Sequence, residues 1–111
     1  VQREDGSWNC SLADPDDFGG PEATGTSLFT YGLAWGVRTG MLDGATYRPA
    51  AARAWNALNR ICIHDNGFIG FSQGSGKEPK EAQPATYDRI PDFEDFGTGC
   101  YLLAASEIAK L

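Results

Sequence analysis

The chain has 111 residues, of which 41% are hydrophobic and 22% are charged, and its formal net charge is −6. This length accommodates one domain, and the composition is that of a globular protein rather than a disordered one. The acidic balance disfavours nucleic acid and anionic membrane surfaces, because both are bound through basic side chains. No apolar run is long enough to cross a membrane. Neither nucleic acid nor a membrane is therefore expected as a partner.

The first residues predict a turn followed by a loop. A turn at residues 5–6 precedes Trp8, and residues 13–21 (ADPDDFGGP) combine the Pro, Gly and Asp residues that favour loops. Trp8 has two interpretations, as a platform for a sugar ring or as a loop side chain packed on the core. Three aspartates of the loop resemble part of a calcium site, but the remaining positions of that motif do not follow. We therefore predict no metal ligands.

Residues 22–42 (EATGTSLFTYGLAWGVRTGML) predict a helix over about 24–40, entered through a short polar turn. Thr24 and Thr26 are both suitable N-caps, because a threonine oxygen can accept a hydrogen bond from an unpaired helical N–H. Glu22 precedes the helix, where the helix dipole stabilises a carboxylate. It is either a capping side chain or a polar group that faces substrate.

The surface of this first helix is apolar on most sides, which is typical of a helix in a protein interior. Its glycines recur every four residues and share one face. A glycine within a helix costs roughly 1 kcal/mol relative to alanine, so three on one face predict a closely packed neighbouring backbone. The glycines are Gly32, Gly36 and Gly40.

An amphipathic pattern predicts the second helix over about 47–62, with Pro49 in its first turn, where no N–H is missed. An Asn-Gly pair at 66–67 between apolar residues predicts a short hairpin near 61–72. His64 adjoins the hairpin tip and is expected to be a solvated turn residue, because no nucleophile accompanies it. One helix is thus apolar on most faces, and the next is half exposed.

Residues 73–91 predict a loop or a partly disordered segment. Residues 99–111 predict a third helix that is again apolar on most faces, with Thr98 as its candidate cap. The three cysteines lack the close spacing of metal ligands, so we expect reduced thiols in the core. They are Cys10, Cys62 and Cys100.

Two apolar helices separated by an amphipathic one indicate an all-α fold in which inner and outer helices alternate around a ring. Three helices cannot close such a ring. The chain is therefore expected to be a piece of a larger toroid domain, or to cover its inner helices with copies of itself.

Five blocks, in this order and spacing, resemble the unsaturated rhamnogalacturonyl hydrolases of glycoside hydrolase family 105 and the related unsaturated glucuronyl hydrolases of family 88. The blocks are DGSW (5–8), EATGTSLFTYGLAWGVRTGMLD (22–43), YRPAAARAWNAL (47–58), NGFIGFSQGSG (66–76) and DFGTGCYLLAASEIAKL (95–111). The resemblance implies an (α/α)6 toroid with its active site at one end. It also implies hydration of the C4=C5 double bond of an unsaturated uronic acid left by a pectin lyase, without a metal or organic cofactor.

The resemblance covers only the C-terminal third of such a protein, so residues 1–111 are expected to be the C-terminal portion of one incomplete toroid domain. A start at Val1 rather than Met agrees with this interpretation. The family's catalytic aspartate, active-site histidine and WARGNGW-like motif all precede the equivalent of Val1. The resemblance therefore implies no catalytic residue in this chain and no turnover by the chain alone.

Four residues of the chain match family positions at the substrate end of the ring: Trp8, Glu22, Thr24 and Thr26. The resemblance implies that they line or support the site of an oligosaccharide substrate. The bacterial cytoplasm or periplasm is the expected location. The alternative from another class is a sugar-binding or self-assembling helical module without catalysis, which would self-associate through exposed inner helices. A different toroid enzyme, such as an epimerase, would keep the fold and change the substrate.

Overall fold

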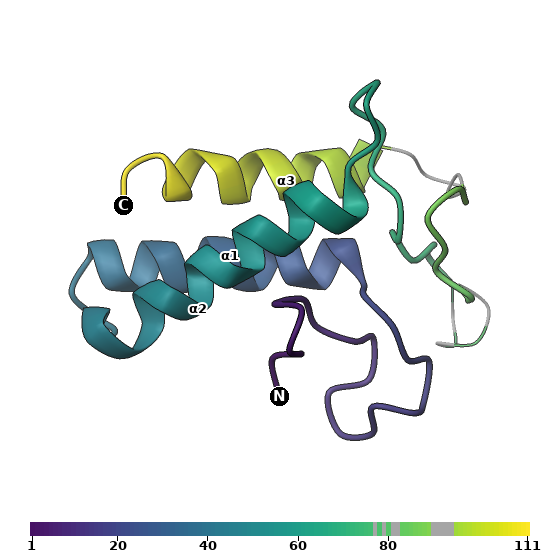
Figure 1. The fold of residues 1–111 in the computed structure, drawn as a ribbon, viewed down its shortest axis with the longest axis horizontal. Coiled ribbons are helices and arrows are strands. Elements are labelled where there is room, and N and C mark those ends of the chain that lie inside the picture. Colours follow the sequence, from purple (N-terminus) through teal and green to yellow (C-terminus); the bar gives the residue numbers. More distant parts are fainter. Residues whose placement is uncertain (77, 79, 81–82, 90–94) are drawn as a thin grey trace.

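The computed structural model describes residues 1–111 except 77, 79, 81–82 and 90–94 (Figure 1). It contains three α-helices, α1 (Ala23–Arg38), α2 (Gly44–Ala57) and α3 (Asp95–Ile108), and α2 continues into a π-helical turn, η1 (Leu58–Cys62). Helices α1 and α3 run in the same direction and α2 runs in the opposite one (Figure 1). The predicted all-α fold with three main helices is confirmed. Within the described ranges, no helix combines the length and the apolar character that a membrane span requires.

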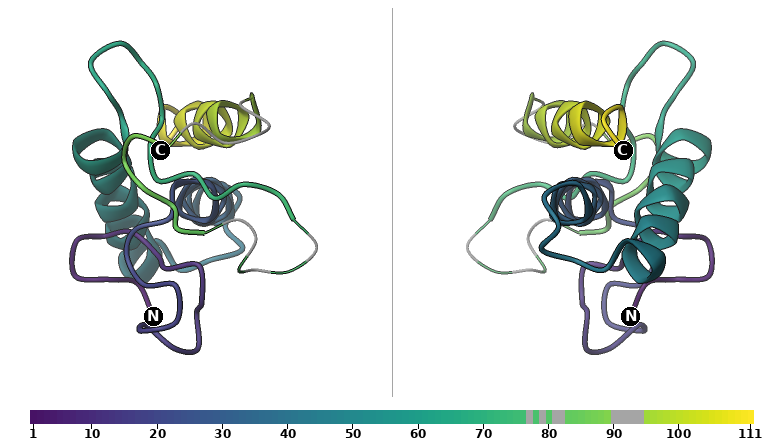
Figure 2. Two further views of the ribbon diagram at one scale, coloured as in Figure 1. Left: turned by 90° about the vertical axis from the view of Figure 1, so that its right-hand side faces the viewer. Right: turned by 90° about the vertical axis from the view of Figure 1, so that its left-hand side faces the viewer.

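Helix α1 lies between α2 and α3 and packs against both, whereas α2 and α3 touch each other little (Figure 2). The buried apolar cluster lies near the start of α1 and the end of α2. It consists of Ala23, Leu58, Cys62 and Ile69, with Trp55, Ile61, Ile63, Phe71 and Tyr101 packed around it. The loops gather at the end of the molecule where α1 and α3 begin (Figure 1). One end of the helical layer is therefore built from loops.

Helix α1 begins at Ala23 because Glu22 is its N-cap. Glu22 has an extended backbone, and its side chain accepts hydrogen bonds from the backbone N–H groups of Thr24 and Gly25. The prediction that Thr24 or Thr26 caps the helix is wrong, because both lie inside it. At the other end, Gly40 has a φ of +76°, a conformation that ends helices, so the helix end predicted near residue 40 is confirmed.

The buried face of α1 is made of small and polar residues rather than large apolar ones. It comprises Ala23, Thr24, Thr26, Ser27, Thr30, Ala34 and Gly36. Three large apolar side chains of the same helix are instead exposed, namely Leu28 (48%), Phe29 (39%) and Trp35 (38%). The apolar faces that the sequence pattern places in an interior are therefore uncovered among the described residues.

No described backbone lies against the glycine face of α1 at Gly32, so the predicted close backbone neighbour stays a prediction for the rest of the toroid. A Cβ added to Gly32 would meet nothing within 4 Å. One added to Gly36 would lie 2.6 Å from Cδ1 of Leu42, which is a side-chain atom of the following turn. Gly40 lies beyond the end of the helix and also has open space.

Replacing Gly32 by alanine should raise the free energy of unfolding of this chain by about 1 kcal/mol, because alanine is the better helix former and open space receives its methyl group. Urea denaturation measures the change. Gly36→Ala is the matched control and should give no such gain, since Leu42 must move. A loss of stability in Gly32→Ala would instead show that another backbone lies against this face in solution.

Helix α2 begins at Gly44, where the side chain of Asp43 accepts a hydrogen bond from the backbone N–H of Thr46 at 2.8 Å. This start is earlier than predicted. Pro49 consequently lies in the second turn rather than the first, so its predicted position is wrong. The buried face of α2 is formed by small side chains, Ala51, Ala54 and Ala57, which allow a close approach to α1.

Helix α3 begins at Asp95, so the prediction of Thr98 as its N-cap is wrong. Near its end, Glu107 is buried and pairs with Arg38 at the end of α1 (2.7 Å) and with Lys110 (2.8 Å). The hydrogen bond from Arg38, followed by that from Lys110, lowers the pKa of Glu107. This ion pair joins the ends of the two parallel helices.

The predicted hairpin near 61–72 is present but short. It has one antiparallel bridge, between Ile63 and Ile69, and a turn closed by a 2.8 Å hydrogen bond from the N–H of Gly67 to the carbonyl of His64. His64 adjoins the turn, as predicted, but its ring is half-buried rather than fully solvated. Its ring stacks on Tyr87 with centroids 3.7 Å apart, and its Nε2 lies 2.8 Å from the Tyr87 carbonyl oxygen. Parts of the loop predicted over 73–91 lie outside the described residues.

Candidate functional site

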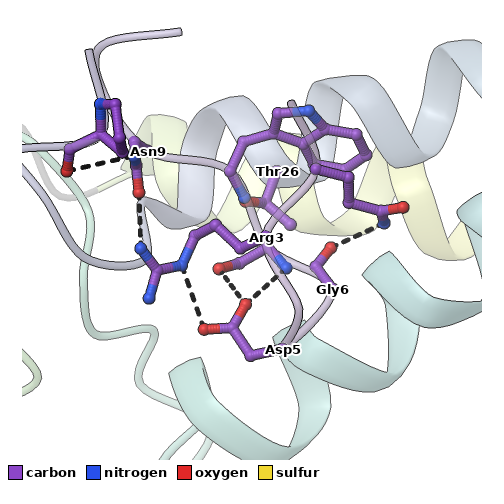
Figure 3. Close-up of polar contacts among 9 residues, drawn as sticks. Arg3, Asp5, Gly6, Asn9 and Thr26 are labelled. Carbon is purple, nitrogen blue, oxygen red and sulfur yellow. Dashed lines mark hydrogen bonds and ion pairs between the residues drawn. The ribbon is translucent and has the colours of Figure 1, made fainter.

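The turn at residues 5–8 is held by the side chain of Asp5 (Figure 3). Its carboxylate accepts hydrogen bonds from the backbone N–H (2.8 Å) and the hydroxyl (2.6 Å) of Ser7, and it pairs with Nε of Arg3 at 3.1 Å. Burial alone would raise the pKa of Asp5, but the hydrogen bonds from Ser7 and Arg3 outweigh it and hold the pKa below its ordinary value. The turn thus depends on an ionised carboxylate.

Acid should destabilise the chain in part through this carboxylate. A carboxyl group whose pKa is lowered by folding contributes stability above its unfolded pKa, near 4, and this contribution is lost as pH falls through the folded pKa. Thermal melts from pH 7 to pH 2 should therefore show a smaller acid loss in Asp5→Asn than in the unsubstituted chain. Asp17→Asn, at an exposed loop position, is the control. Equal acid slopes in all three proteins would contradict the prediction.

Trp8 leads from this turn to the start of α1 and is 8% exposed. Its backbone N–H donates to Oγ1 of Thr26 at 2.9 Å, and its carbonyl oxygen accepts from the backbone N–H of Glu22 at 2.9 Å. Its ring packs against Phe29 at a centroid distance of 4.9 Å. The tryptophan therefore fixes the first loop against α1, and its ring has little free face.

Glu22 is 2% exposed, and both carboxylate oxygens are engaged. One oxygen accepts hydrogen bonds from the backbone N–H (2.9 Å) and the hydroxyl of Thr24, and from the backbone N–H of Gln73 (3.3 Å). The other oxygen accepts from the backbone N–H of Gly25 at 2.6 Å. The carboxylate therefore joins the start of α1 to the segment that follows the hairpin.

The structure brings the four predicted substrate-end residues together. Trp8 contacts Thr26 and Glu22, and Thr24 contacts Glu22. All four are buried, and their polar atoms bond mainly to one another and to neighbouring backbone. This arrangement holds loops in place at the end of the molecule where α1 and α3 begin.

Sequence reasoning missed the polar side chains that adjoin this cluster. Nε2 of Gln83 lies 2.9 Å from Sγ of Cys10 and 3.4 Å from Oε1 of Gln73. Gln73 falls within a block that carries the family resemblance, which was the only available signal for it. Gln83 lies in a polar loop without periodicity, so no pattern marks it.

The cysteines are free thiols, as predicted, although only Cys62 lies in the core. Burial raises the pKa of Cys62 to about 12, and burial likewise raises the pKa values of Cys10 and Cys100. The thiols are therefore protonated at neutral pH and are poor nucleophiles. In the described part of the chain, no group of three His, Cys, Asp or Glu side chains is arranged to hold a metal ion.

An open hollow of about 330 Å³ lies beside the first loop. It contains none of the four predicted substrate-end residues. It is lined by Val1, Gln2, Arg3, Glu4, Asn9, Ser11, Leu12, Ala13 and Pro15.

The sequence model of Glycosyl Hydrolase Family 88 matches residues 1–111, which is the whole chain. The chain belongs to Glycosyl Hydrolase Family 88. Two curated relatives are named unsaturated 3S-rhamnoglycuronyl hydrolases. The one from Formosa agariphila is 40% identical over 111 residues, and the one from an Alteromonas species is 38% identical over 108 residues. The resemblance to this pair of related hydrolase families is thereby confirmed.

Solved structures of similar proteins agree with the family 88 assignment. A glycosyl hydrolase of family 88 from Bacteroides vulgatus superposes with a TM-score of 0.84 and 38% identity over 98% of this chain. A polysaccharide lyase superposes with a TM-score of 0.80 and 36% identity over the same share. The three helices are therefore part of an α/α toroid, as predicted from the alternation of inner and outer helices.

The chain is much shorter than these family 88 relatives. It spans 28% and 24% of the two curated relatives and 30% of each solved structure. It corresponds to one sector of their toroid, with a hydrogen-bonded cluster of loop and helix-start residues at one end.

Proposed function

We propose that residues 1–111 are the C-terminal portion of a toroid glycoside hydrolase that acts on oligosaccharides ending in an unsaturated uronic acid. The observation that carries this proposal is identity of about two residues in five, across the whole chain, with two relatives named unsaturated 3S-rhamnoglycuronyl hydrolases. Pectin-derived rhamnogalacturonan fragments are the proposed source of the substrate.

The proposed reaction is hydration of the C4=C5 double bond of the unsaturated uronic acid. Protonation of the vinyl ether and addition of water give a hydrated sugar, which opens and releases the rest of the oligosaccharide. The residues described above include no activated nucleophile or oriented acid–base pair, so the catalytic groups are assigned to the rest of the longer protein. No cofactor is needed for this reaction.

The part played by this chain is to form and hold one side of the substrate end. Trp8, Glu22, Thr24 and Thr26 support that end by fixing the loops to α1. The N-terminus of α3 points toward the same end, and its dipole favours the carboxylate of a uronic acid, whereas the N-terminus of α1 is already occupied by the Glu22 carboxylate.

We expect no turnover by the isolated chain and turnover by the full-length protein. The substrate is an unsaturated disaccharide made from rhamnogalacturonan with a lyase, and loss of the ultraviolet absorbance of its double bond measures the reaction. The full-length protein provides the positive control. Turnover by the 111-residue chain alone would contradict the assignment of catalysis to the missing part, and no turnover by either protein would contradict the proposed function.

Exposed apolar side chains favour self-association as the second candidate. Leu28, Phe29 and Trp35 of α1 and Leu102 and Leu103 of α3 are all more than a third exposed. In the proposed toroid, the rest of the protein covers these faces. Gel filtration of the isolated chain distinguishes the two cases, because a monomer agrees with a sector of a larger domain and a stable dimer favours a self-assembling module.

A further inference from the structure

The side-chain amides of Gln73 and Gln83 meet beside the buried carboxylate of Glu22. Nε2 of Gln83 lies 3.4 Å from Oε1 of Gln73, and the backbone N–H of Gln73 donates to Glu22 at 3.3 Å. Both glutamines are half-buried, so each retains an exposed part. The pair lies next to the cluster at the proposed substrate end, and the proposed function assigns it no role.

Hydrogen bonds on both sides fix the backbone that carries Gln73. Phe71, two residues earlier, has a φ of +57°, which is uncommon for a residue other than glycine. Its N–H donates to the carbonyl of Thr86 and its carbonyl accepts from the N–H of Ala23, each at 2.9 Å. An unfavourable backbone conformation held in this way is often found at functional positions.

Gln83 is itself held in place by its neighbours. Its Oε1 accepts from the backbone N–H of Ala85 at 2.9 Å, and its Nε2 donates to Sγ of Cys10 and toward Oε1 of Gln73. Gln83 thus orients the amide of Gln73 so that the carbonyl side faces Gln83. No described residue accepts a hydrogen bond from the N–H side of the Gln73 amide.

The chemistry around this amide favours a neutral ligand. A side-chain amide donates and accepts hydrogen bonds without charge, which suits a sugar hydroxyl. Among the described residues, the thiol of Cys10 contacts the Gln83 amide and the Glu22 carboxylate accepts from the backbone N–H of Gln73, and this carboxylate opposes a second anion nearby. A hydroxyl of an uncharged sugar therefore fits better than the carboxylate of the uronic acid.

We propose that Gln73 is a specificity-determining residue that binds a hydroxyl of the neutral sugar attached to the unsaturated uronic acid, and that Gln83 is its positioning residue. This inference rests on the proposed function. It predicts that the contribution of Gln73 depends on the presence of the neutral sugar.

Calorimetric titration tests the inference with two probes. It uses the full-length protein made inactive by replacing the catalytic aspartate that the family resemblance implies, so that neither probe is consumed. One is the unsaturated uronyl–rhamnose disaccharide, and the other is the methyl glycoside of the same unsaturated uronic acid, which lacks the neutral sugar. Gln73→Ala should weaken binding of the disaccharide three- to tenfold, as expected for one lost hydrogen bond, and leave the methyl glycoside within about twofold. Gln83→Ala should show the same selectivity with a smaller loss.

Asn59→Ala is the matched control, because this amide bonds Tyr101 and the Trp55 carbonyl and should not affect either probe. Equal losses for both probes would assign Gln73 a structural role and overturn the inference, as would unchanged affinity for the disaccharide or no binding of it by the protein with both glutamines intact. Disaccharide binding that shows the predicted selectivity, without turnover by the active full-length protein, would support the inference while contradicting the proposed function.

Discussion

Replacing Gly6 by alanine should lower the free energy of unfolding by about 3 kcal/mol. Gly6 has a φ of +98°, a conformation that L side chains rarely adopt. A Cβ added there would lie 2.4 Å from the backbone carbonyl oxygen of Arg53 in α2. Because that oxygen belongs to a helix, it cannot move aside as a flexible side chain could. Urea denaturation, with the midpoint and the slope both fitted, measures the loss.

Gly67→Ala separates the two causes of this effect. Gly67 also has a positive φ, +88°, but a Cβ there would meet nothing within 4 Å. Its substitution should lower the free energy of unfolding only by the cost of a positive φ for alanine, roughly 1 kcal/mol. If the two variants lose equal stability, the contact between the first turn and α2 is looser than the structure shows.

The existence and order of the helices could be predicted from sequence, but their starting residues could not. The starts of α1 and α2 are each set by a cap, and the sequence offered Glu22 as one of several candidate caps but did not mark Asp43. Glu22 caps α1 although glutamate is not among the preferred N-cap residues, and Asp43 caps α2 before the first amphipathic position. Hydrophobic periodicity reports where a helix is buried, whereas a cap depends on one local side-chain contact.

Hydrophobic periodicity also failed to predict which side chains of α1 are buried. Leu28, Phe29 and Trp35 were expected inside because large apolar residues usually are. In this chain, Thr26, Ser27 and Thr30 occupy the buried face instead. A periodic pattern identifies a face that suits burial, but the identity of the covering element depends on chain that lies elsewhere in the toroid.

Local sequence alone offered Trp8 and Glu22 as possible substrate contacts, and the family resemblance extended the candidate site. The resemblance selected Trp8, Glu22, Thr24 and Thr26, and the structure brings them into contact. No local pattern linked Gln73 to Gln83, because an irregular loop decides which residues meet across it.

Replacing Glu22 by alanine should lower the free energy of unfolding by about 3 kcal/mol. The substitution leaves several buried donors without an acceptor, and it removes the N-cap of α1. Amide hydrogen exchange should become faster, most of all at Thr24, Gly25 and Gln73, because their backbone N–H groups donate hydrogen bonds to the Glu22 carboxylate. Exchange identifies the lost contacts, and urea denaturation gives the size of the loss.

Two further variants separate the two roles of Glu22, which caps α1 and also binds the backbone N–H of Gln73. Glu22→Gln keeps one carbonyl oxygen but turns an NH2 group toward N–H donors, so its loss of stability should fall between that of alanine and zero. Thr24→Val removes one hydroxyl donor while keeping all backbone contacts of Glu22, and should cost about 1 kcal/mol. If exchange at Gln73 stays slow in Glu22→Ala, the loop is held by Phe71 and its neighbours alone. In that case Glu22 caps α1 without positioning Gln73, and the buried carboxylate has no part in holding the proposed substrate contact.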